Sequence, residues 1–213
     1  MIDLYTWATP NGRKVSIILE ELGLDYNVHE INIAKGEQHT PEFLTVSPDN
    51  KIPGIVDSDG PAGPGGEPLS MFETGAILIY LAEKTESELY PKDFKKRMAT
   101  LQWLMWQMGG VGPMFGQAHH FMFNPSEVVP YAQERYHKEA KRLYKVMNTQ
   151  MQDNRYLAGD DYTVADIATF PWVDRFRRHQ VDLAEFPNVK RWHEELWERP
   201  AVKKGMEVPF YNQ

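Results

Sequence analysis

Three short segments in the first eighty residues carry side chains whose types and spacing suit the binding of a small peptide. The turn Thr-Pro-Asn-Gly at 9–12 leads into an apolar helical stripe, and a helix N-terminus offers N–H groups and a positive dipole to an anion. Lys-Ile-Pro at 51–53 precedes a strand pattern, where an X-Pro bond can leave a backbone edge open to an extended peptide. Glu73-Thr74 places an acid and a hydroxyl at a second helix start, which suits a zwitterionic amino-acid head group.

The cysteine count decides where any sulfur chemistry can come from. The 213 residues include no cysteine, which excludes disulfides and thiolate metal sites. A thiol that takes part in a reaction must therefore be the ligand's own. Taken with the three segments, this predicts a small thiol peptide as ligand.

Residues 1–84 mix strand and helix patterns and are expected to form one domain. The expected elements are a strand at 2–5, a helix at 13–22 closed by Gly23, a strand at 26–31, a short helix at 41–46, a strand at 54–57, a short strand from 68 and a helix at 73–84. A glycine- and proline-rich loop separates the last two strands. This order predicts an α/β, thioredoxin-like layer, a small mixed sheet with helices on its faces.

From residue 94 onward the strand patterns disappear, so 94–213 is expected to be an all-helical domain, with 85–93 as the linker. Residues 95–108 are apolar on most faces, which predicts burial on most faces, as helix core or dimer surface. The run Gly109–Pro113 is expected to break or kink that helix. Further helices are expected at 130–151, 189–196 and 200–205. Thr163 and Asp166 have the spacing of a capping box for another helix, a folding element without a catalytic role.

Overall charge and hydropathy exclude several classes of partner. With 23 basic and 30 acidic residues the net charge is −7, which argues against nucleic acid as the main partner. No apolar run approaches the ~20 residues of a membrane span. The strand pattern begins at once, without a signal-peptide core, and the cytoplasm is the expected location.

Other groups of histidines and glycines do not have the spacing of a metal site or a phosphate loop. His119 and His120 are adjacent and diverge around a helix, with no acidic or thiolate ligand nearby. His193 begins a zinc-protease pattern, but Trp197 stands where the second histidine must be. The glycines at 60–66 lack the Gly-Lys-Ser/Thr ending of a phosphate loop. No metal site is expected.

Three segments occur in a specific order: Ile-Pro before the third strand, Glu-Thr at the last helix of the first domain, and a Thr-x-x-Asp cap in the helical domain. In this order of segments, the whole chain resembles a cytosolic glutathione transferase. The strings at 9–12, 50–53, 72–78 and 109–114 are together similar to the bacterial nu-class enzymes, which are disulfide-bond oxidoreductases using glutathione. The resemblance implies a homodimer whose sites each take two glutathiones or one glutathione disulfide.

The resemblance also implies roles for single residues in holding the first glutathione. Ile52 offers its backbone N–H and C=O to the cysteinyl part, and a cis Pro53 holds that edge open. Thr74 binds the γ-glutamyl carboxylate at a helix start, and Glu73 faces the ammonium.

The remaining implied roles concern the glycyl end, the thiol and the second glutathione. Lys51 and Gln38 bind toward the glycyl end. The thiol lies near Thr9 and Asn11, whose hydroxyl and amide donors lower its pKa from ~8.5 by stabilising the thiolate. For the second glutathione, Arg135 binds a carboxylate, with weaker support from Tyr131, four residues earlier on the same helix face.

Simpler interpretations stay open at this point. Thr9 and Asn11 also suit a plain turn and helix cap, Glu73-Thr74 a plain helix start, and Ile52-Pro53 an ordinary trans dipeptide. Three functions are compatible with the pattern. They are glutathione-dependent disulfide reduction, glutathione conjugation to electrophiles or reduction of organic hydroperoxides, and a non-catalytic glutathione-fold module that binds a partner protein.

Overall fold

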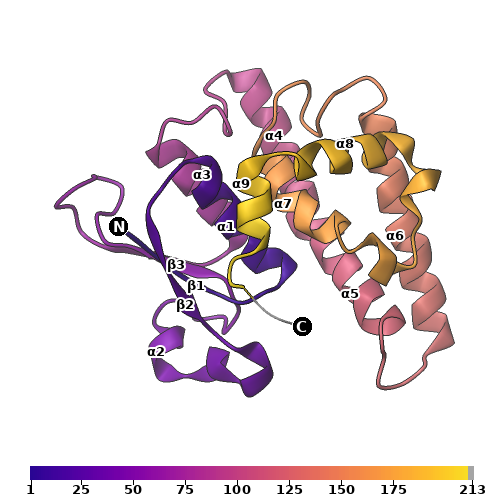
Figure 1. Cartoon of the computed structure of the whole chain (residues 1–213), viewed down its shortest axis with the longest axis horizontal. Coiled ribbons are helices and arrows are strands. Elements are labelled where there is room, and N and C mark those ends of the chain that lie inside the picture. Colours follow the sequence, from indigo (N-terminus) through magenta and orange to yellow (C-terminus); the bar gives the residue numbers. More distant parts are fainter. Residues whose placement is uncertain (211–213) are drawn as a thin grey trace. The chain divides into compact units, whose positions relative to one another are not determined.

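The computed structural model describes residues 1–210, which form two compact units. One unit contains residues 1–88 and the chain from Arg199 to the end of the described part, and the other contains residues 89–198. Figure 1 follows the elements in chain order.

The first unit is built on a four-stranded mixed sheet in the order β2-β1-β3-β4. Its strands are β1 (Ile2–Thr6), β2 (Tyr26–Glu30), β3 (Gly54–Asp57) and β4 (Leu69–Met71). β1 pairs in parallel with β2 and antiparallel with β3, which pairs antiparallel with β4. The parallel pair needs a crossover, and α1 (Pro10–Glu21) supplies it. The predicted thioredoxin-like sheet is confirmed.

The other elements of this unit are two 3₁₀ turns and three helices. They are η1 (Ile33–Lys35), η2 (Glu37–His39), α2 (Pro41–Leu44), α3 (Thr74–Lys84) and α9 (Pro200–Met206). The apolar stripe of α1 forms the core, since Val15, Ile17, Ile18 and Leu19 are completely buried. Ile77, Leu78 and Leu81 of α3 are equally buried.

The last helix, α9, packs on α1, whereas the sequence analysis placed it in the helical domain. A Cβ at Gly205 would come within 2.6 Å of the Ile17 Cα, so the two helices approach as closely as only glycine allows. Ser16 Oγ donates to the Gly205 carbonyl at 2.6 Å. Arg199 binds Glu21 in a bidentate pair at 2.7 Å. These contacts join the end of the chain to the sheet unit.

The second unit is entirely helical within its described residues. Its elements are α4 (Phe94–Trp106), η3 (Gln107–Val111), α5 (Gly112–Met122), α6 (Pro130–Gln150), α7 (Val164–Val173), η4 (Phe176–His179), η5 (Leu183–Glu185) and α8 (Pro187–Trp197). The capping box predicted at the start of α7 is present. Asp166 is buried and accepts from the backbone N–H groups of Leu157 and Thr163 and from Trp192 Nε1. Burial raises the pKa of Asp166 to about 6, and these donors oppose the rise.

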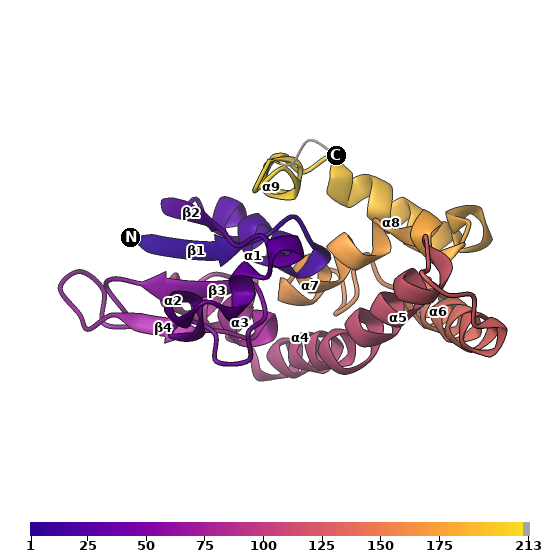
Figure 2. The ribbon, with the colours of Figure 1, turned by 90° about the horizontal axis from the view of Figure 1, so that it is seen from below.

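One expectation for the helix that contains residues 95–108 is confirmed and one is wrong. The α-helix is interrupted near Gly109–Pro113, as predicted, although the chain stays helical there because η3 is a π-helical turn between α4 and α5, as Figure 2 shows. In contrast to the prediction, α4 is not buried on most faces. In the single chain only Thr100 and Leu104 of this helix are buried, while Met98 and Met105 are 38% and 48% exposed, although the helix packs against α7.

Within residues 1–210, no helix combines the length and the apolar character needed to cross a membrane.

Candidate functional site

The start of α1 brings together the two residues expected to stabilise a thiolate. Thr9 is the N-cap, and its Oγ1 accepts from the Gly12 N–H at 3.1 Å, while Pro10 occupies the first turn. Asn11 follows in the same turn, and both predicted residues are partly exposed. The cap contact occupies only an acceptor lone pair of Thr9. Its O–H can still donate to an anion placed over the helix start.

Gly12 explains why this turn lies so close to the first strand. A Cβ on Gly12 would stand 2.3 Å from the Trp7 carbonyl oxygen and 2.5 Å from Thr6 Oγ1. Only glycine fits, and the start of α1 is therefore held directly against the end of β1. The position of the predicted thiolate donors is fixed by backbone packing.

The segment before β3 has the backbone conformation that the resemblance implied. The Ile52-Pro53 bond is cis. Within residues 1–210, the N–H and C=O of Ile52 form no hydrogen bond, so both can pair with an added peptide. Ser47 Oγ donates to the Lys51 carbonyl at 2.8 Å and holds the segment from its other side.

Lys51 and Glu73 share one electrostatic environment although 22 residues separate them. Lys51 is exposed and pairs with Asp49 at 2.7 Å. The hydrogen bond to Asp49 raises the pKa of Lys51, and the charge of Glu73 adds to the effect. Gln38 lies in η2, where its Nε2 is 3.2 Å from His39 Nε2. Within residues 1–210, its buried Oε1 lacks a hydrogen-bond partner.

Glu73 and Thr74 begin α3 in an unusual backbone conformation. Glu73 is the N-cap residue with φ 70° and ψ 107°, a region that residues other than glycine rarely adopt. Such conformations concentrate at functional sites, where the surrounding structure imposes them. Glu73 is exposed and Thr74 is 5% exposed, so an exposed acid and a buried hydroxyl stand next to each other at the start of this helix.

Lys14 joins this group, and the sequence analysis missed it. The side chain is 1% exposed, and its Nζ donates to Thr74 Oγ1 at 3.4 Å. Burial lowers the pKa of Lys14 to about 7, and the Glu73 charge opposes the shift. The signal was present, because Lys14 lies four residues before Ile18 and so on the face of α1 predicted to be buried.

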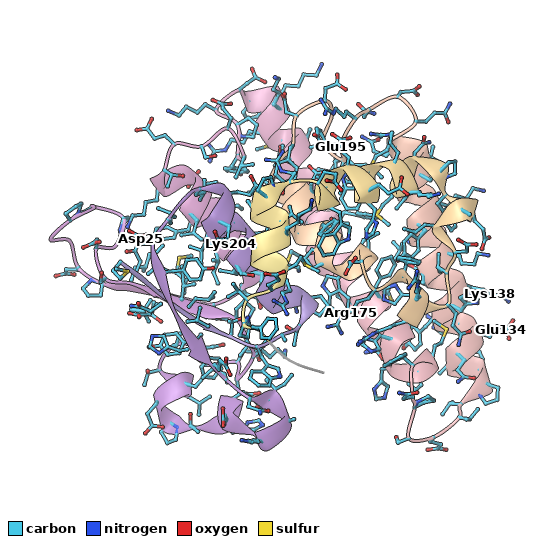
Figure 3. The ribbon with its side chains drawn as sticks, viewed as in Figure 1. Asp25, Glu134, Lys138, Arg175, Glu195 and Lys204 are labelled. Atoms are coloured by element: carbon cyan, nitrogen blue, oxygen red, sulfur yellow. The ribbon has the colours of Figure 1, made fainter. Side chains whose placement is uncertain are left out.

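The second unit carries Tyr131 and Arg135, which the structure brings together on α6. Both line a hollow of about 590 Å³ whose other lining residues are Met114, Glu134, Tyr136, Lys138, Glu139 and Arg142. Lys138 pairs with Glu134, as Figure 3 shows on the outer side of α6. Arg142 binds Glu139 through two contacts of 2.8 Å. The side chain of Arg135 is exposed and, within residues 1–210, forms no hydrogen bond or ion pair, although its charge helps to lower the pKa of Glu139.

The histidine clusters have structural partners instead. His193 Nε2 lies 2.9 Å from Asp174 Oδ1, and Trp197 Nε1 donates to the same carboxylate at 2.9 Å. His119 is partly buried, which lowers its pKa to about 4. In the described part of the chain, no three histidine or acidic side chains gather in a way that could hold a metal ion.

Known proteins match almost the whole chain. The family model for the glutathione S-transferase N-terminal domain matches residues 8–84, and the one for the C-terminal domain matches residues 112–200. The chain is 52% identical to the disulfide-bond oxidoreductase YfcG of Escherichia coli (strain K12), over 97% of the chain and 94% of YfcG.

Solved structures show the same similarity. A Burkholderia graminis glutathione transferase with two glutathione molecules bound per subunit is 43% identical with a TM-score of 0.90, covering 99% of this chain and 89% of that one. A Pseudomonas putida glutathione transferase with one glutathione disulfide bound per subunit is 44% identical with a TM-score of 0.90, covering 98% and 91%. This chain belongs to the glutathione S-transferase family.

Proposed function

We propose that the protein is a glutathione-dependent disulfide-bond oxidoreductase. The observation that carries this proposal is the start of α1, where Thr9 and Asn11 can stabilise a thiolate in a chain that has no cysteine. The name of its E. coli relative and the glutathione in related structures support it.

The proposed reaction uses only sulfur from glutathione and substrate. The thiolate of a first glutathione attacks one sulfur of the substrate disulfide, the S–S bond breaks, and the other sulfur leaves as a thiolate that takes up a proton. A second glutathione thiolate then attacks the glutathione sulfur of the mixed disulfide and releases the second substrate thiol. Two glutathiones are oxidised to glutathione disulfide, and the substrate gains two electrons and two protons.

The first glutathione is assigned to the sheet unit. Ile52 pairs with its cysteinyl backbone through the open N–H and C=O beside the cis Pro53. Thr74 and the start of α3 bind the γ-glutamyl carboxylate, and Glu73 binds the ammonium. Lys51 and Gln38 bind toward the glycyl end.

The second glutathione is assigned to the α6 hollow. Arg135 binds one of its carboxylates, and Tyr131 supports it. The support is that the Arg135 side chain forms no ion pair within residues 1–210, whereas Lys138 and Arg142, in the same hollow, already bind acidic partners. Related structures hold two glutathiones or one glutathione disulfide per subunit.

We also propose a homodimer located in the cytoplasm. Exposed apolar side chains on α4, among them Phe94 at 76% and Met105 at 48%, support a further copy as a packing partner. The reaction consumes reduced glutathione, which the cytoplasm maintains.

The test is a pair of assays on the pure protein with glutathione. Reduction of 2-hydroxyethyl disulfide is coupled to glutathione reductase and NADPH, and conjugation is followed with 1-chloro-2,4-dinitrobenzene. Strong disulfide turnover with weak conjugation is expected. The opposite pattern would identify a conjugating transferase, and no turnover of either substrate despite glutathione binding would identify a non-catalytic module.

A further inference from the structure

The start of α1 contains the sequence Asn11-Gly12, and Asn-Gly is the dipeptide in which asparagine loses its side-chain amide most readily. The backbone nitrogen of the following residue attacks the side-chain carbonyl carbon and closes a succinimide ring. Glycine favours this reaction because it has no side chain to hinder the attack and leaves the backbone free to rotate. This is the one Asn-Gly pair in the sequence, and Asn11 is partly exposed, so water can reach it.

Two separate requirements keep this pair in place. A Cβ on Gly12 would stand 2.3 Å from the Trp7 carbonyl oxygen, so the packing of the turn against β1 requires glycine. Asn11 supplies the side-chain amide that is proposed above to stabilise the glutathione thiolate. The demands of the turn therefore bring a chemically labile pair into the proposed active site.

The folded turn restrains the same reaction. The Gly12 N–H donates to Thr9 Oγ1 at 3.1 Å, which holds the attacking nitrogen in the helix cap. The next N–H, that of Arg13, donates to the Thr9 carbonyl oxygen at 3.0 Å. Ring closure requires Asn11 to leave the helical ψ of about −42°, and this rotation displaces Gly12 and breaks the cap. The first turn of α1 must therefore open before Asn11 can react.

We propose that Asn11 is a deamidation site protected by the Thr9 cap, and that its modification inactivates the enzyme, which rests on the function proposed above. When the turn opens, the Gly12 nitrogen bonds to Cγ of Asn11, and the side-chain nitrogen leaves with the Gly12 proton as ammonia. Water then opens the succinimide at either of its carbonyls and leaves aspartate or isoaspartate at position 11.

Both products change the charge where the thiol of glutathione is expected. A carboxylate beside the thiolate raises the pKa of the bound thiol, because two like charges disfavour ionisation. Isoaspartate also adds a methylene group to the backbone just before Gly12, where the close approach to β1 leaves no room. A ligand bound at the closed turn should slow the reaction, because it stabilises the closed state over the open one.

The test measures the rate of deamidation directly. Wild type, Thr9→Ser and Thr9→Ala are incubated at pH 8.5 and 37 °C, and the tryptic peptide 1–13 is analysed by mass spectrometry, with isoaspartate identified by its fragment ions. Thr9→Ser keeps the hydroxyl of the cap and Thr9→Ala removes it. Wild type in guanidinium chloride gives the rate of the unrestrained pair. Circular dichroism confirms that each variant is folded.

We expect the folded wild type to react at least about 10-fold more slowly than the denatured chain, since local opening is the minor state. Thr9→Ala should react about 5-fold faster than wild type, the factor that corresponds to the loss of a helix N-cap, and Thr9→Ser should stay within about 2-fold. S-methylglutathione at about 10 times its Kd should slow the wild type about 10-fold. Disulfide turnover should fall in proportion to the modified fraction.

Equal rates for folded and denatured wild type, or for Thr9→Ala and wild type, would overturn protection by the cap. If Thr9→Ala does not fold, the wild type decides, since its rate must still lie below that of the denatured chain. Failure of the proposed function gives a different result. Full disulfide turnover by Asn11→Asp would remove the effect on activity and leave the modification itself intact, and bound S-methylglutathione that does not slow deamidation would place the ligand away from this turn.

Discussion

The two regions assigned to glutathione differ in how their polar groups are held. At the starts of α1 and α3 the groups are fixed by the backbone, and Lys14 and Thr74 are almost completely buried. On α6 the groups are side chains in solvent, where Tyr131 is 74% exposed. Buried polar groups cannot rearrange or be replaced by water, whereas exposed charges are screened and mobile.

This difference predicts a division of labour. Under the proposed function, we expect the sheet unit to fix one glutathione rigidly enough to control the ionisation of its thiol. We expect the α6 hollow to hold a second molecule through adaptable contacts that adjust to different substrates. Substitutions in the first region are therefore expected to have large effects on catalysis or stability, and those in the second region modest effects on affinity.

The largest expected effect is that of Asn11→Ala on disulfide reduction. Loss of one positioned donor to a reacting anion lowers turnover by about 100- to 1000-fold. The pKa of the bound glutathione thiol rises at the same time, because the thiolate loses a hydrogen bond. Turnover of 2-hydroxyethyl disulfide and the ultraviolet absorbance of the bound thiolate across pH measure the two quantities.

Matched variants separate this role from helix capping. Asn11→Ala replaces a poor helix former by a good one, so its thermal unfolding is expected to be unchanged or slightly better. Thr9→Ser keeps the hydroxyl cap and most activity, whereas Thr9→Ala also costs about 1 kcal/mol of stability. Full activity in the Thr9→Ala, Asn11→Ala double variant would refute the assignment of both residues.

The second-largest effect is on stability, because burial of the Lys14 ammonium destabilises the protein when no ligand is bound. Lys14→Met is expected to raise the free energy of unfolding at pH 7 by about 2–3 kcal/mol. This is somewhat less than the free energy that corresponds to the whole difference between a pKa of about 7 and the ~10.4 of an exposed lysine. Urea unfolding without glutathione measures it. A loss of stability would show that the ammonium contributes favourable contacts that outweigh its burial.

The pH dependence provides an independent check with a definite sign. The folded-state pKa of Lys14 is about 7, below the value in the unfolded chain, so the unfolded state binds more protons between pH 7 and about 10. This residue therefore makes the wild type more stable as the pH rises through that window. Lys14→Met should lack this contribution, so the two unfolding free energies should converge toward pH 10.

Local chemistry in the sequence predicted much of the first region. The turn at 9–12 is a helix start and Glu73-Thr74 begins α3, because each feature depends on a few neighbouring residues. The cis Ile52-Pro53 bond was implied by the family resemblance alone, since its local sequence is equally compatible with a trans bond. The burial of Lys14 depends on packing between elements far apart in the chain. Thr74 is 60 residues away from it.

The misjudged helices have the same explanation. Residues 95–108 are apolar around most of the helix, but sequence periodicity does not say which faces another element covers. Gly109 and Gly110 lower helix propensity, and the α-helix does give way there, but local sequence does not predict that a π-helical turn keeps the chain helical. The association of α9 with α1 rests on the fit of Gly205 against Ile17, which no local pattern reveals.

The smallest expected effect is on the α6 side, where Arg135→Ala should raise the KM for glutathione in disulfide reduction about 5- to 10-fold with kcat nearly unchanged. An exposed charge contact contributes about 1 kcal/mol when its ligand is a carboxylate. Arg142→Ala is the matched control, because the same hollow contains this arginine but Glu139 already binds it. Its KM is expected to stay within about 2-fold of wild type.

Ionic strength is expected to change the effects of Arg135→Ala and Lys14→Met to different extents. Raising the ionic strength from 0.05 to 0.5 M shortens the Debye length from about 14 to 4 Å. The charge of Arg135 is then screened, so the KM for glutathione should differ little between Arg135→Ala and wild type. The effect of Lys14→Met on the free energy of unfolding should persist in the same salt, because the side chain is buried. Equal salt sensitivity of both effects would mean that the charges of the two regions are equally open to screening, contrary to the comparison drawn from their burial.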